Sequence, residues 1–407
     1  MTAREPDTID LDVGPIAHGG HCVARADGRV VFVRHALPGE RVRAVVTATR
    51  GRYLRADAVE VLEAAPDRVA SPCPYSGPGG CGGCDFQHVA PAAQRRLKAA
   101  IVREQLVRVA GIPDRPVTVE ALPGGASGWR TRVRYLADAG GRLGLRRHRS
   151  HEIVPVDRCR IAHPDIQDLP LTGERWTPGE VVEAVRGSSG DPVVWRGSER
   201  RAGNRAGGRG AGPHRSLAGP TVVEQVFDRR FTIAASGFWQ VHPGAATALA
   251  TAVIELLDPG RGERAWDLYG GAGLFAAAIA ERVGTGGRVT VVESARDSVA
   301  AARRCLADLP QVRIVGGDVA SALSNPRWRS VDLVVADPPR TGLGPEVVPR
   351  IVERAPRAIA YVSCDPATFA RDLRTFATHG YALAGLRAFD AFPMTHHVEV
   401  VGLLTAP

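Results

Sequence analysis

Residues 264–283, RAWDLYGGAGLFAAAIAERV, decide the fold class of this chain. An apolar, strand-like run leads into a turn rich in glycine, and a helix-like apolar run follows. The alternation continues through RVTVVES, VRIVGGDV, VDLVVADPP, AIAYVSCDP and a terminal HVEVVGLLTA. Strands and helices that alternate in this way predict an α/β domain with a doubly wound parallel sheet, whose ligands bind at the carboxyl ends of the strands.

The glycine-rich turn of this stretch indicates a nucleotide-like ligand. Gly271, Gly273 and Ala276 satisfy the G-x-G-x-x-A pattern, in which bare backbone and a helix N-terminus approach the ligand. Glu293 closes the next strand, where a carboxylate binds ribose hydroxyls. These features fit NAD and S-adenosylmethionine equally well.

The sequence DPPR at 337–340 separates these two ligands. An acid followed by two prolines at the end of a fourth strand is typical of methyltransferases rather than dehydrogenases. Enzymes that methylate exocyclic amines usually carry an aromatic residue after the prolines, and Arg340 stands there instead. The motif therefore disfavours an exocyclic amine as the methyl acceptor.

The stretch YVSCDPATFARDL (361–373) puts a cysteine at the junction of a predicted strand and helix. The strand opens at Ala358, Asp365 can cap the helix and Pro366 suits its first position. Cys364 therefore lies just before a helix N-terminus, where the dipole favours the reactive thiolate. From these residues alone, a small buried core cysteine is an equal alternative.

A thiol at this place has a use if the methyl acceptor is an unactivated ring carbon such as C5 of uracil. Addition of the thiolate at C6 makes C5 nucleophilic, so that C5 can take the methyl group of the sulfonium. A base must then remove the C5 proton before the thiol can leave. Glu399, in THHVEVV, is the candidate base, and His396 and His397 would frame the site.

A second group of cysteines predicts a metal site. The chain has seven cysteines and no secretory signal, so metal or catalytic roles are favoured over disulfides. CPYSGPGGCGGCDFQH holds Cys73, Cys81 and Cys84, and Cys159 is the best candidate for a fourth ligand. Three clustered cysteines with one distant partner suit a [4Fe–4S] cluster better than zinc. His88 is a competing ligand.

The chain is expected to have three domains. Its 407 residues and 44% hydrophobic composition allow two or three cores. From Ile9 to about Val61, short β segments separated by turn signals predict a small barrel, which could be structural or bind oligonucleotides. We expect a barrel at 1–64, a central α+β domain with the cysteine cluster at 65–230, and the α/β domain at 231–407.

Arginines mark the central domain. A strand at 130–135 would present Arg130, Arg132 and Arg134 on one face, and Arg146, Arg147 and Arg149 follow on the next strand-like segment. We interpret this repetition as a phosphate-binding surface, although a solvated arginine face would look the same. The net charge of +9 agrees with a polyanionic partner.

The Gly/Arg-rich segment 196–216 is predicted to be a disordered loop. No stretch of the chain approaches the length of a membrane helix, and the N-terminus lacks a long apolar run. We therefore expect a cytoplasmic monomer.

Five motifs, in this order, carry a family resemblance: GFWQVHP, DLYGGAGLFA, DPPRTGL, YVSCDPATFARDL and THHVEVV. Together they resemble the RNA uracil-C5 methyltransferases, and the cysteines and barrel resemble the branch with a TRAM domain that acts on large-subunit rRNA and certain tRNAs. The resemblance implies a Rossmann-like class I methyltransferase domain, an OB-like TRAM barrel and an iron–sulfur site in the central domain.

The resemblance also implies roles for single residues. Cys364 would be the nucleophile and Glu399 the proton acceptor. The residues around S-adenosylmethionine would be Gln240, Tyr269, Glu293, Asp318 and Asp337, and the [4Fe–4S] ligands would be Cys73, Cys81, Cys84 and Cys159. The implied partner is RNA, and we expect a uridine of 23S rRNA, with a tRNA T-loop uridine as the alternative.

Three features depart from the family pattern. The gap between Cys73 and Cys81 is long, the Gly/Arg-rich segment has no counterpart, and Asp365 replaces the usual asparagine after the nucleophile. The charge of Asp365 would oppose formation of the thiolate. A Rossmann oxidoreductase and a non-catalytic RNA-binding protein are the rival hypotheses, and both leave the pairing of Cys364 with Glu399 unexplained.

Overall fold

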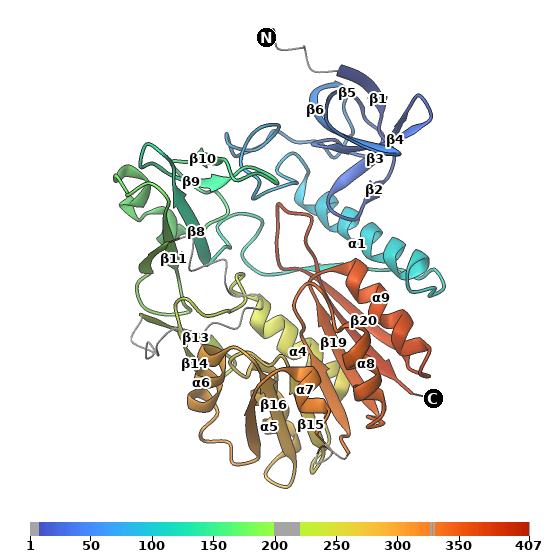
Figure 1. Ribbon diagram of the computed structural model, residues 1–407, viewed down its shortest axis with the longest axis vertical. Coiled ribbons are helices and arrows are strands. Elements are labelled where there is room, and N and C mark those ends of the chain that lie inside the picture. Colours follow the sequence, from blue (N-terminus) through green and yellow to red (C-terminus); the bar gives the residue numbers. More distant parts are fainter. Residues whose placement is uncertain (1–7, 199–219, 326–327, 329, 407) are drawn as a thin grey trace.

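The computed structural model describes residues 8–198, 220–325, 328 and 330–406. Its strands form a six-stranded sheet, a five-stranded sheet, a two-stranded hairpin and an eight-stranded sheet. The sheets follow one another along the chain, except that β7 (Val119–Ala121) joins the eight-stranded sheet. Figure 1 shows the first sheet at one end of the molecule, the second beside it and the largest at the opposite end. Within the described residues, we find no helix with the length and apolar character needed to cross a membrane.

The N-terminal sheet forms the predicted barrel. It contains β1 (Thr8–Asp12), β2 (Ile16–Ala17), β3 (His21–Ala26), β4 (Arg29–Arg34), β5 (Arg41–Arg50) and β6 (Tyr53–Glu63), in the order β1-β5-β6-β4-β3-β2. The segment after β1 bonds to β3, because Gly14 N donates to Val23 O (2.8 Å) and Val23 N donates to Pro15 O (2.9 Å). These bonds curl the sheet around its own core.

The central sheet contains β8 (Arg132–Ala137), β9 (Leu143–Arg146), β10 (Ile153–Pro155), β11 (Glu180–Val185) and β12 (Val193–Ser198), in the order β10-β9-β8-β11-β12. Its core includes the buried rings of Trp129 and Trp176 together with Cys159. The short elements α2 (Pro164–Gln167) and η1 (Pro170–Gly173) follow β10. The hairpin β13 (Thr221–Val226) and β14 (Arg229–Ala234) leads to the last sheet.

The largest sheet is the predicted α/β sheet. Its strands are β15 (Arg264–Leu268), β16 (Arg288–Glu293), β17 (Val312–Gly316), β18 (Leu333–Ala336), β19 (Ala358–Ser363), β20 (Ala382–Asp390), β21 (Glu399–Thr405) and β7 (Val119–Ala121). The order is β17-β16-β15-β18-β19-β21-β20-β7. The first five strands in this order are parallel, whereas β21 is antiparallel to β19 and to β20. The predicted doubly wound parallel sheet is therefore confirmed over these five strands, and an antiparallel strand adjoins it at one edge.

Helices cover both faces of this sheet. One core joins it to α4 (Ala245–Leu257), α5 (Leu274–Val283) and α6 (Arg296–Cys305). The other core joins it to α1 (Pro91–Arg108), α7 (Val319–Leu323), α8 (Gly344–Val352) and α9 (Pro366–Ala377). Strands β18 and β19 are buried along their whole length, which explains why both are continuous apolar runs in the sequence. Both α1 and β7 come from the region expected to be the central domain.

The arginine-rich segments differ from their prediction. Arg132 and Arg134 lie on β8, but Arg132 donates to Ala235 O (3.0 Å) and Gly237 O (2.7 Å), and Arg134 pairs with Glu183 (3.6 Å). The guanidiniums of Arg132 and Arg134, which were predicted to bind phosphate, thus interact with other groups of the protein.

Two further segments also differ. Strand β9 ends at Arg146; Arg147 forms an isolated bridge with Cys81, and Arg149 lies in the turn that follows rather than on a strand. The segment predicted as a loop starts within β12, where Arg196 stacks on Trp176 at 4.4 Å from the ring centroid. The rest of that loop, 199–216, lies outside the described residues.

Candidate active site

Cys364 lies between the end of β19 and the start of α9, as predicted. Asp365 is the N-cap: its Oδ1 accepts from Ala367 N (3.0 Å) and Thr368 N (2.9 Å). Pro366 is the first helical residue, so the local sequence signals for a helix start are confirmed.

Glu399 is brought beside this junction by the neighbouring strand. It begins β21, which pairs with β19 in a register that sets Val400 opposite Ser363. Its side chain is buried, and its Oε2 has no hydrogen-bond partner among the described residues. A buried carboxyl oxygen without a partner is costly, and this cost marks Glu399 as a candidate functional group.

Burial and nearby acidic groups disfavour the charged forms of both Cys364 and Glu399. Burial and the Glu399 carboxylate raise the pKa of Cys364 to about 12, and Asp337 and Asp365 add to this shift while Arg340 opposes it. Burial, followed by Asp337, raises the pKa of Glu399 well above its ordinary value. The helix dipole, which was predicted to favour the thiolate, would act in the opposite direction to burial and these carboxylates.

Arg340 was noted in the sequence only as a substitute for an aromatic residue. In the structure its charge lowers the pKa of both Cys364 and Glu399, against the effect of burial. Its Nη2 also lies 3.4 Å from Nε2 of His397, one of the two histidines expected to frame the site. The other, His396, bonds through Nδ1 to Asp85 (2.6 Å).

A contact from the barrel reaches Asp365, the residue after Cys364, and sequence analysis missed it. Nε2 of His18 lies 3.2 Å from Oδ2 of Asp365. Burial opposes ionisation of Asp365, but the bonds from His18 and from the helix N-terminus bring its pKa down to about 2. The hydrogen bond to Asp365 raises the pKa of His18. The barrel thus supplies a partner for the acid that departs from the family pattern.

The glycine-rich turn has the geometry of a ligand cradle. Glu293 ends β16, and its Oε2 accepts from Gly271 N (3.0 Å). Tyr269 has a left-handed backbone (φ 61°), an uncommon conformation that is concentrated at functional sites. Asp267, which sequence analysis did not single out, accepts from Ala276 N (2.9 Å), and burial raises its pKa to about 8. This bond holds the start of α5 against the sheet.

The remaining predicted ligand-binding residues lie in different environments. Asp337 follows β18, and burial raises its pKa to about 7. Asp318 is the N-cap of α7, where Oδ1 accepts from Ser321 N (2.9 Å), so capping already engages its carboxylate. Gln240 lies in the segment of the chain that joins β14 to α4, and its side chain is buried.

The predicted cluster cysteines surround a single cavity. Cys73, Cys81, Cys84 and Cys159 all line it, and His88 is not among its described lining residues. All four are free thiols, and burial raises the pKa of Cys84 to about 12. Nevertheless, no group of three or more His, Cys, Asp or Glu side chains in the described ranges is arranged to hold a metal ion.

Comparisons with known proteins match two regions of the chain to described families. Residues 224–406 match the family described as tRNA (Uracil-5-)-methyltransferase, and residues 4–59 match the TRAM domain. A chain of Streptomyces avermitilis called an uncharacterized RNA methyltransferase is 47% identical, over 98% of each chain.

A 23S rRNA (uracil(1939)-C(5))-methyltransferase of Alkalilimnicola ehrlichii is 32% identical, over 97% of this chain and 96% of its own. The fold is also that of the Pyrococcus abyssi tRNA (uracil-54, C5)-methyltransferase solved with S-adenosyl-L-homocysteine. Its TM-score is 0.70, with 22% identity over 97% of this chain and 100% of that chain. The motifs, the fold and these relatives agree: the chain belongs to the RNA uracil-C5 methyltransferase family.

Proposed function

We propose that this enzyme uses S-adenosylmethionine to form 5-methyluridine at a specific uridine of 23S rRNA, with Cys364 as nucleophile and Glu399 as proton acceptor. The observation that carries the proposal is the meeting of these two side chains at one buried site, beside Arg340 and at the carboxyl ends of the parallel strands. The similarity to a 23S rRNA methyltransferase supports the choice of RNA.

The proposed reaction forms and breaks the Cys364 bond within one cycle. The deprotonated Sγ adds to C6 of uracil, and the electron pair delocalises onto C5 and O4. S-adenosylmethionine would supply the methyl group, which C5 takes as the S–CH3 bond breaks and S-adenosylhomocysteine leaves. Glu399 then accepts the C5 proton, and elimination at C6 releases the thiolate and restores the aromatic ring.

The raised pKa values of Cys364 and Glu399 oppose the charged forms that the proposed reaction needs. Cys364 must lose its proton before attack, and Glu399 must be ionised before it can accept one. Arg340 favours the charged form of both groups. It would therefore stabilise the thiolate at first and the carboxylate later.

The methyl donor would bind over the glycine-rich turn. Glu293 lies at the carboxyl end of β16, and the Gly271 amide lies in the glycine-rich turn beside it. A ribose is bound at this place in this type of fold. Tyr269, Gln240, Asp318 and Asp337 would complete the site. Asp337 lies close enough to Cys364 for its charge to raise the pKa of the thiol, which suits a place between the methyl donor and the nucleophile.

We further propose that Cys73, Cys81, Cys84 and Cys159 hold a [4Fe–4S] cluster. The shared cavity and the thiolate-forming donor set fit such a group, which would take the cysteines as thiolates. The cluster would cross-link the cysteine loop to the segment after β10. Iron and sulfide analysis of anaerobically purified protein tests this assignment, and Cys159→Ser should lose both elements together.

The test of the reaction is a covalent trap. RNA that contains 5-fluorouridine should form an adduct at Cys364 after methyl transfer, because fluorine at C5 cannot leave as a proton. Denaturing electrophoresis and peptide mass would detect and map the adduct. Cys364→Ala should form none, and an adduct mapped to another residue would contradict the assignment.

Glu399→Gln provides the matched control for the second step. With ordinary RNA, this variant should add the thiolate and transfer the methyl group but accumulate the methylated adduct, since the amide cannot accept the C5 proton. A Glu399→Gln enzyme that turns over like wild type would remove Glu399 from the mechanism. Mapping of 5-methyluridine in a deletion strain identifies the target: loss in tRNA with unchanged 23S rRNA would favour the T-loop alternative.

A further inference from the structure

The turn between β2 and β3 brings the barrel against two segments of the active site. Nε2 of His18 in this turn lies 3.2 Å from Oδ2 of Asp365, and the nearby Gly20 lies against the side chain of His396. We propose that His18 is a positioning residue of the enzyme, whose imidazolium offsets the charge of Asp365 and thereby favours the thiolate of Cys364. The inference rests on the proposed function, in which Cys364 is the nucleophile, and deepens it.

Two glycines allow the turn to approach the active site this closely. Gly19 and Gly20 both have left-handed backbones (φ 93° and 76°), and Gly20 N donates to Ala17 O (3.2 Å). An added Cβ at Gly20 would lie 2.5 Å from the Cβ of His396, so this contact leaves no room for a larger residue. It holds the turn against the segment that leads to Glu399.

Asp365 joins the turn to the nucleophile. It follows Cys364 directly in the chain, and its charge is one of those that raise the pKa of the thiol. Its Oδ1 accepts from two backbone amides at the start of α9, which fixes the carboxylate, and its Oδ2 faces His18. In the described part of the chain, His18 is the only cationic side chain that forms an ion pair with Asp365.

The surroundings of His18 favour its protonated form. The hydrogen bond to Asp365 raises the pKa of His18, burial lowers it less strongly, and the charges of Asp365 and of Glu104 on α1 raise it further. Glu104 also pairs with Arg108 on the same helix (2.7 Å). The His18 side chain is 37% exposed, so solvent screens the pair and its effect on the thiol should be modest.

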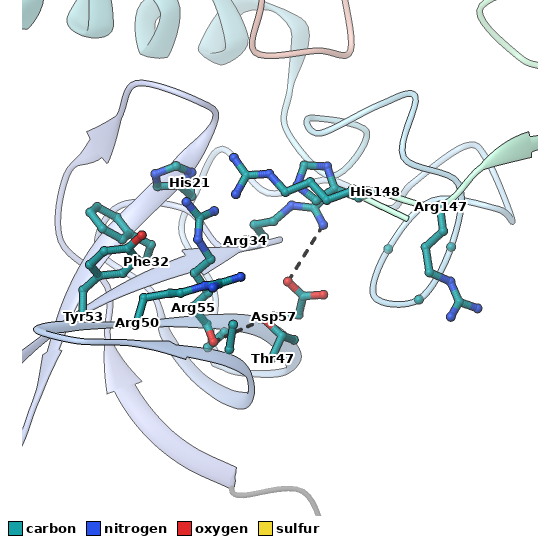
Figure 2. A pocket seen from close by; sticks show the side chains of 16 residues that line it. His21, Phe32, Arg34, Thr47, Arg50, Tyr53, Arg55, Asp57, Arg147 and His148 are labelled. Carbon is teal, nitrogen blue, oxygen red and sulfur yellow. Dashed lines mark hydrogen bonds and ion pairs between the residues drawn. The ribbon is translucent and has the colours of Figure 1, made fainter. Parts of the chain in front are cut away.

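The other histidine at this turn faces a different place. Figure 2 shows His21, the first residue of β3, beside Phe32 in the pocket between the barrel and the turn after β9. Its ring packs edge-on against Phe32 with the centroids 4.8 Å apart, and burial lowers the pKa of His21 to about 4. Its environment therefore favours the neutral form, so His18 is the histidine of this turn that can supply a charge.

The other charges around Cys364 come from the large sheet and its loops. Glu399 on β21 and Asp337 after β18 raise the pKa of the thiol, and Arg340 in the loop after β18 lowers it. Arg340 acts on the thiol directly, whereas the imidazolium of the barrel turn would act through the neighbouring aspartate. A second cation beside this group of acids shifts the balance toward the thiolate.

The effect concerns a single ionisation. The Cys364 thiol gives up its proton to water, and the thiolate remains to attack C6 of uracil. His18 is not the acceptor of that proton and does not touch the substrate. It lowers the cost of placing a negative charge on Sγ next to the carboxylate of Asp365.

The test follows alkylation of Cys364 by iodoacetamide in the full chain between pH 6 and 9. The thiolate is the form that reacts, so the rate reports its population without RNA or S-adenosylmethionine. Cleavage after arginine releases residues 358–371, whose one cysteine is Cys364, so peptide mass follows this thiol apart from the others. His18→Ala should react about threefold more slowly than wild type at pH 6, the size expected for one partly exposed ion pair.

The difference between His18→Ala and wild type should shrink toward pH 9, because the wild-type imidazole then loses its proton. His18→Lys keeps a cation over the whole range, so it should match wild type at pH 6 and exceed it at pH 9. His379→Ala is the matched control, because His379 is exposed beyond the other end of α9. It should react like wild type at every pH.

Asp365→Asn removes the group through which His18 acts. Without the carboxylate, the main cause that raises the pKa of His18 is lost and burial favours the neutral imidazole. Addition of His18→Ala to Asp365→Asn should therefore leave the alkylation rate at pH 7 unchanged.

A ratio of His18→Ala to wild type that stays constant from pH 6 to 9 would overturn the inference, because a packing defect does not titrate with an imidazole. So would equal slowing by His18→Ala in the wild-type and Asp365→Asn backgrounds. The 5-fluorouridine adduct is measured on the same preparations. If it forms at Cys364 while alkylation is independent of His18, only this inference fails; if alkylation depends on His18 as expected but no adduct forms at Cys364, the proposed function fails.

Discussion

At the scale of single residues, the environment of Cys364 contains charges of opposite effect. Asp365 raises the pKa of the thiol, and Arg340 lowers it. Because attack requires the thiolate, the rate should rise with pH as Cys364 loses its proton. Anything that lowers the pKa of Cys364 moves this rising limb to lower pH.

Asp365→Asn should therefore shift the rising limb of kcat/KM to lower pH. Asparagine keeps the N-cap of α9, as its side-chain oxygen can accept from Ala367 N and Thr368 N, while the charge that opposes the thiolate disappears. The measurement is the pH profile of methyl transfer under kcat/KM conditions.

Arg340→Gln is the variant of opposite sign. Loss of the Arg340 guanidinium should raise the pKa of Cys364 and move the rising limb of kcat/KM to higher pH. It should also slow the reaction by about a hundredfold at neutral pH. Shifts in the same direction for both variants would contradict the opposite effects assigned to these two charges on Cys364.

The His18 to Asp365 contact gives stability a defined pH window. The folded pKa of Asp365, about 2, lies below its ordinary 3.8, so its contribution is present above the ordinary value and is lost as pH falls toward 2. The folded pKa of His18 is raised above 6.5, so its contribution is full below 6.5 and is lost as pH rises through the folded value.

His18→Ala should accordingly destabilise the protein most between about pH 4 and 6.5, and the difference from wild type should shrink above that range. Urea unfolding at several pH values measures it. A difference that is constant with pH would mean that His18 acts by packing and not by charge.

At the scale of elements, the DPPRTGL loop depends on one glycine. Gly342 has a left-handed backbone (φ 76°), and an added Cβ would lie 2.4 Å from Oδ2 of Asp372. That oxygen accepts from Leu343 N (2.7 Å) and from the buried Tyr361 hydroxyl (2.8 Å). The loop, β19 and α9 are therefore held together at one carboxylate.

Gly342→Ala should lower the free energy of unfolding by about 2 kcal/mol or more and reduce methyl transfer, because the methyl group displaces Asp372. Gly344→Ala is the matched control: its φ is 75°, yet nothing lies within 4 Å of an added Cβ. It should cost only the backbone strain, about 1 kcal/mol. Equal losses for the two variants would rule out the clash with Asp372.

At the scale of the whole molecule, α1 anchors the segment that leads to Glu399. Lys98 is fully buried, its Nζ bonds to Asp390 (2.6 Å), and it also donates to Phe392 O (2.9 Å). Gln94 holds the same segment through Met394 N (2.8 Å). The catalytic carboxylate candidate thus depends on contacts from a helix far away in the sequence.

Lys98→Met should destabilise the protein by about 3–5 kcal/mol, because it leaves the buried Asp390 carboxylate unpaired. The double variant Lys98→Met/Asp390→Leu removes both charges and should regain most of that loss. Chemical denaturation measures both. If the double variant is no more stable than Lys98→Met, the loss arises from packing.

The sequence by itself determined the elements and the chemistry of single positions. Periodicity predicted the barrel and the α/β sheet, and Asp365 with Pro366 predicted the start of α9 behind Cys364, because capping acts over a few neighbouring residues. The family motifs supplied the roles proposed for Cys364 and Glu399. Alternation also indicated arginine faces, but not which guanidiniums are engaged by the protein itself.

Only the tertiary structure decided which distant groups meet and which of them carry charge. The antiparallel entry of β21 beside β19, the contact of His18 with Asp365 and the path from Arg34 through Asp85 to His396 all join residues far apart in the chain. Protonation of Cys364 and Glu399 likewise depends on burial and on charges from several elements. No local pattern encodes these properties, since desolvation and pairwise charge interactions act through space rather than along the sequence.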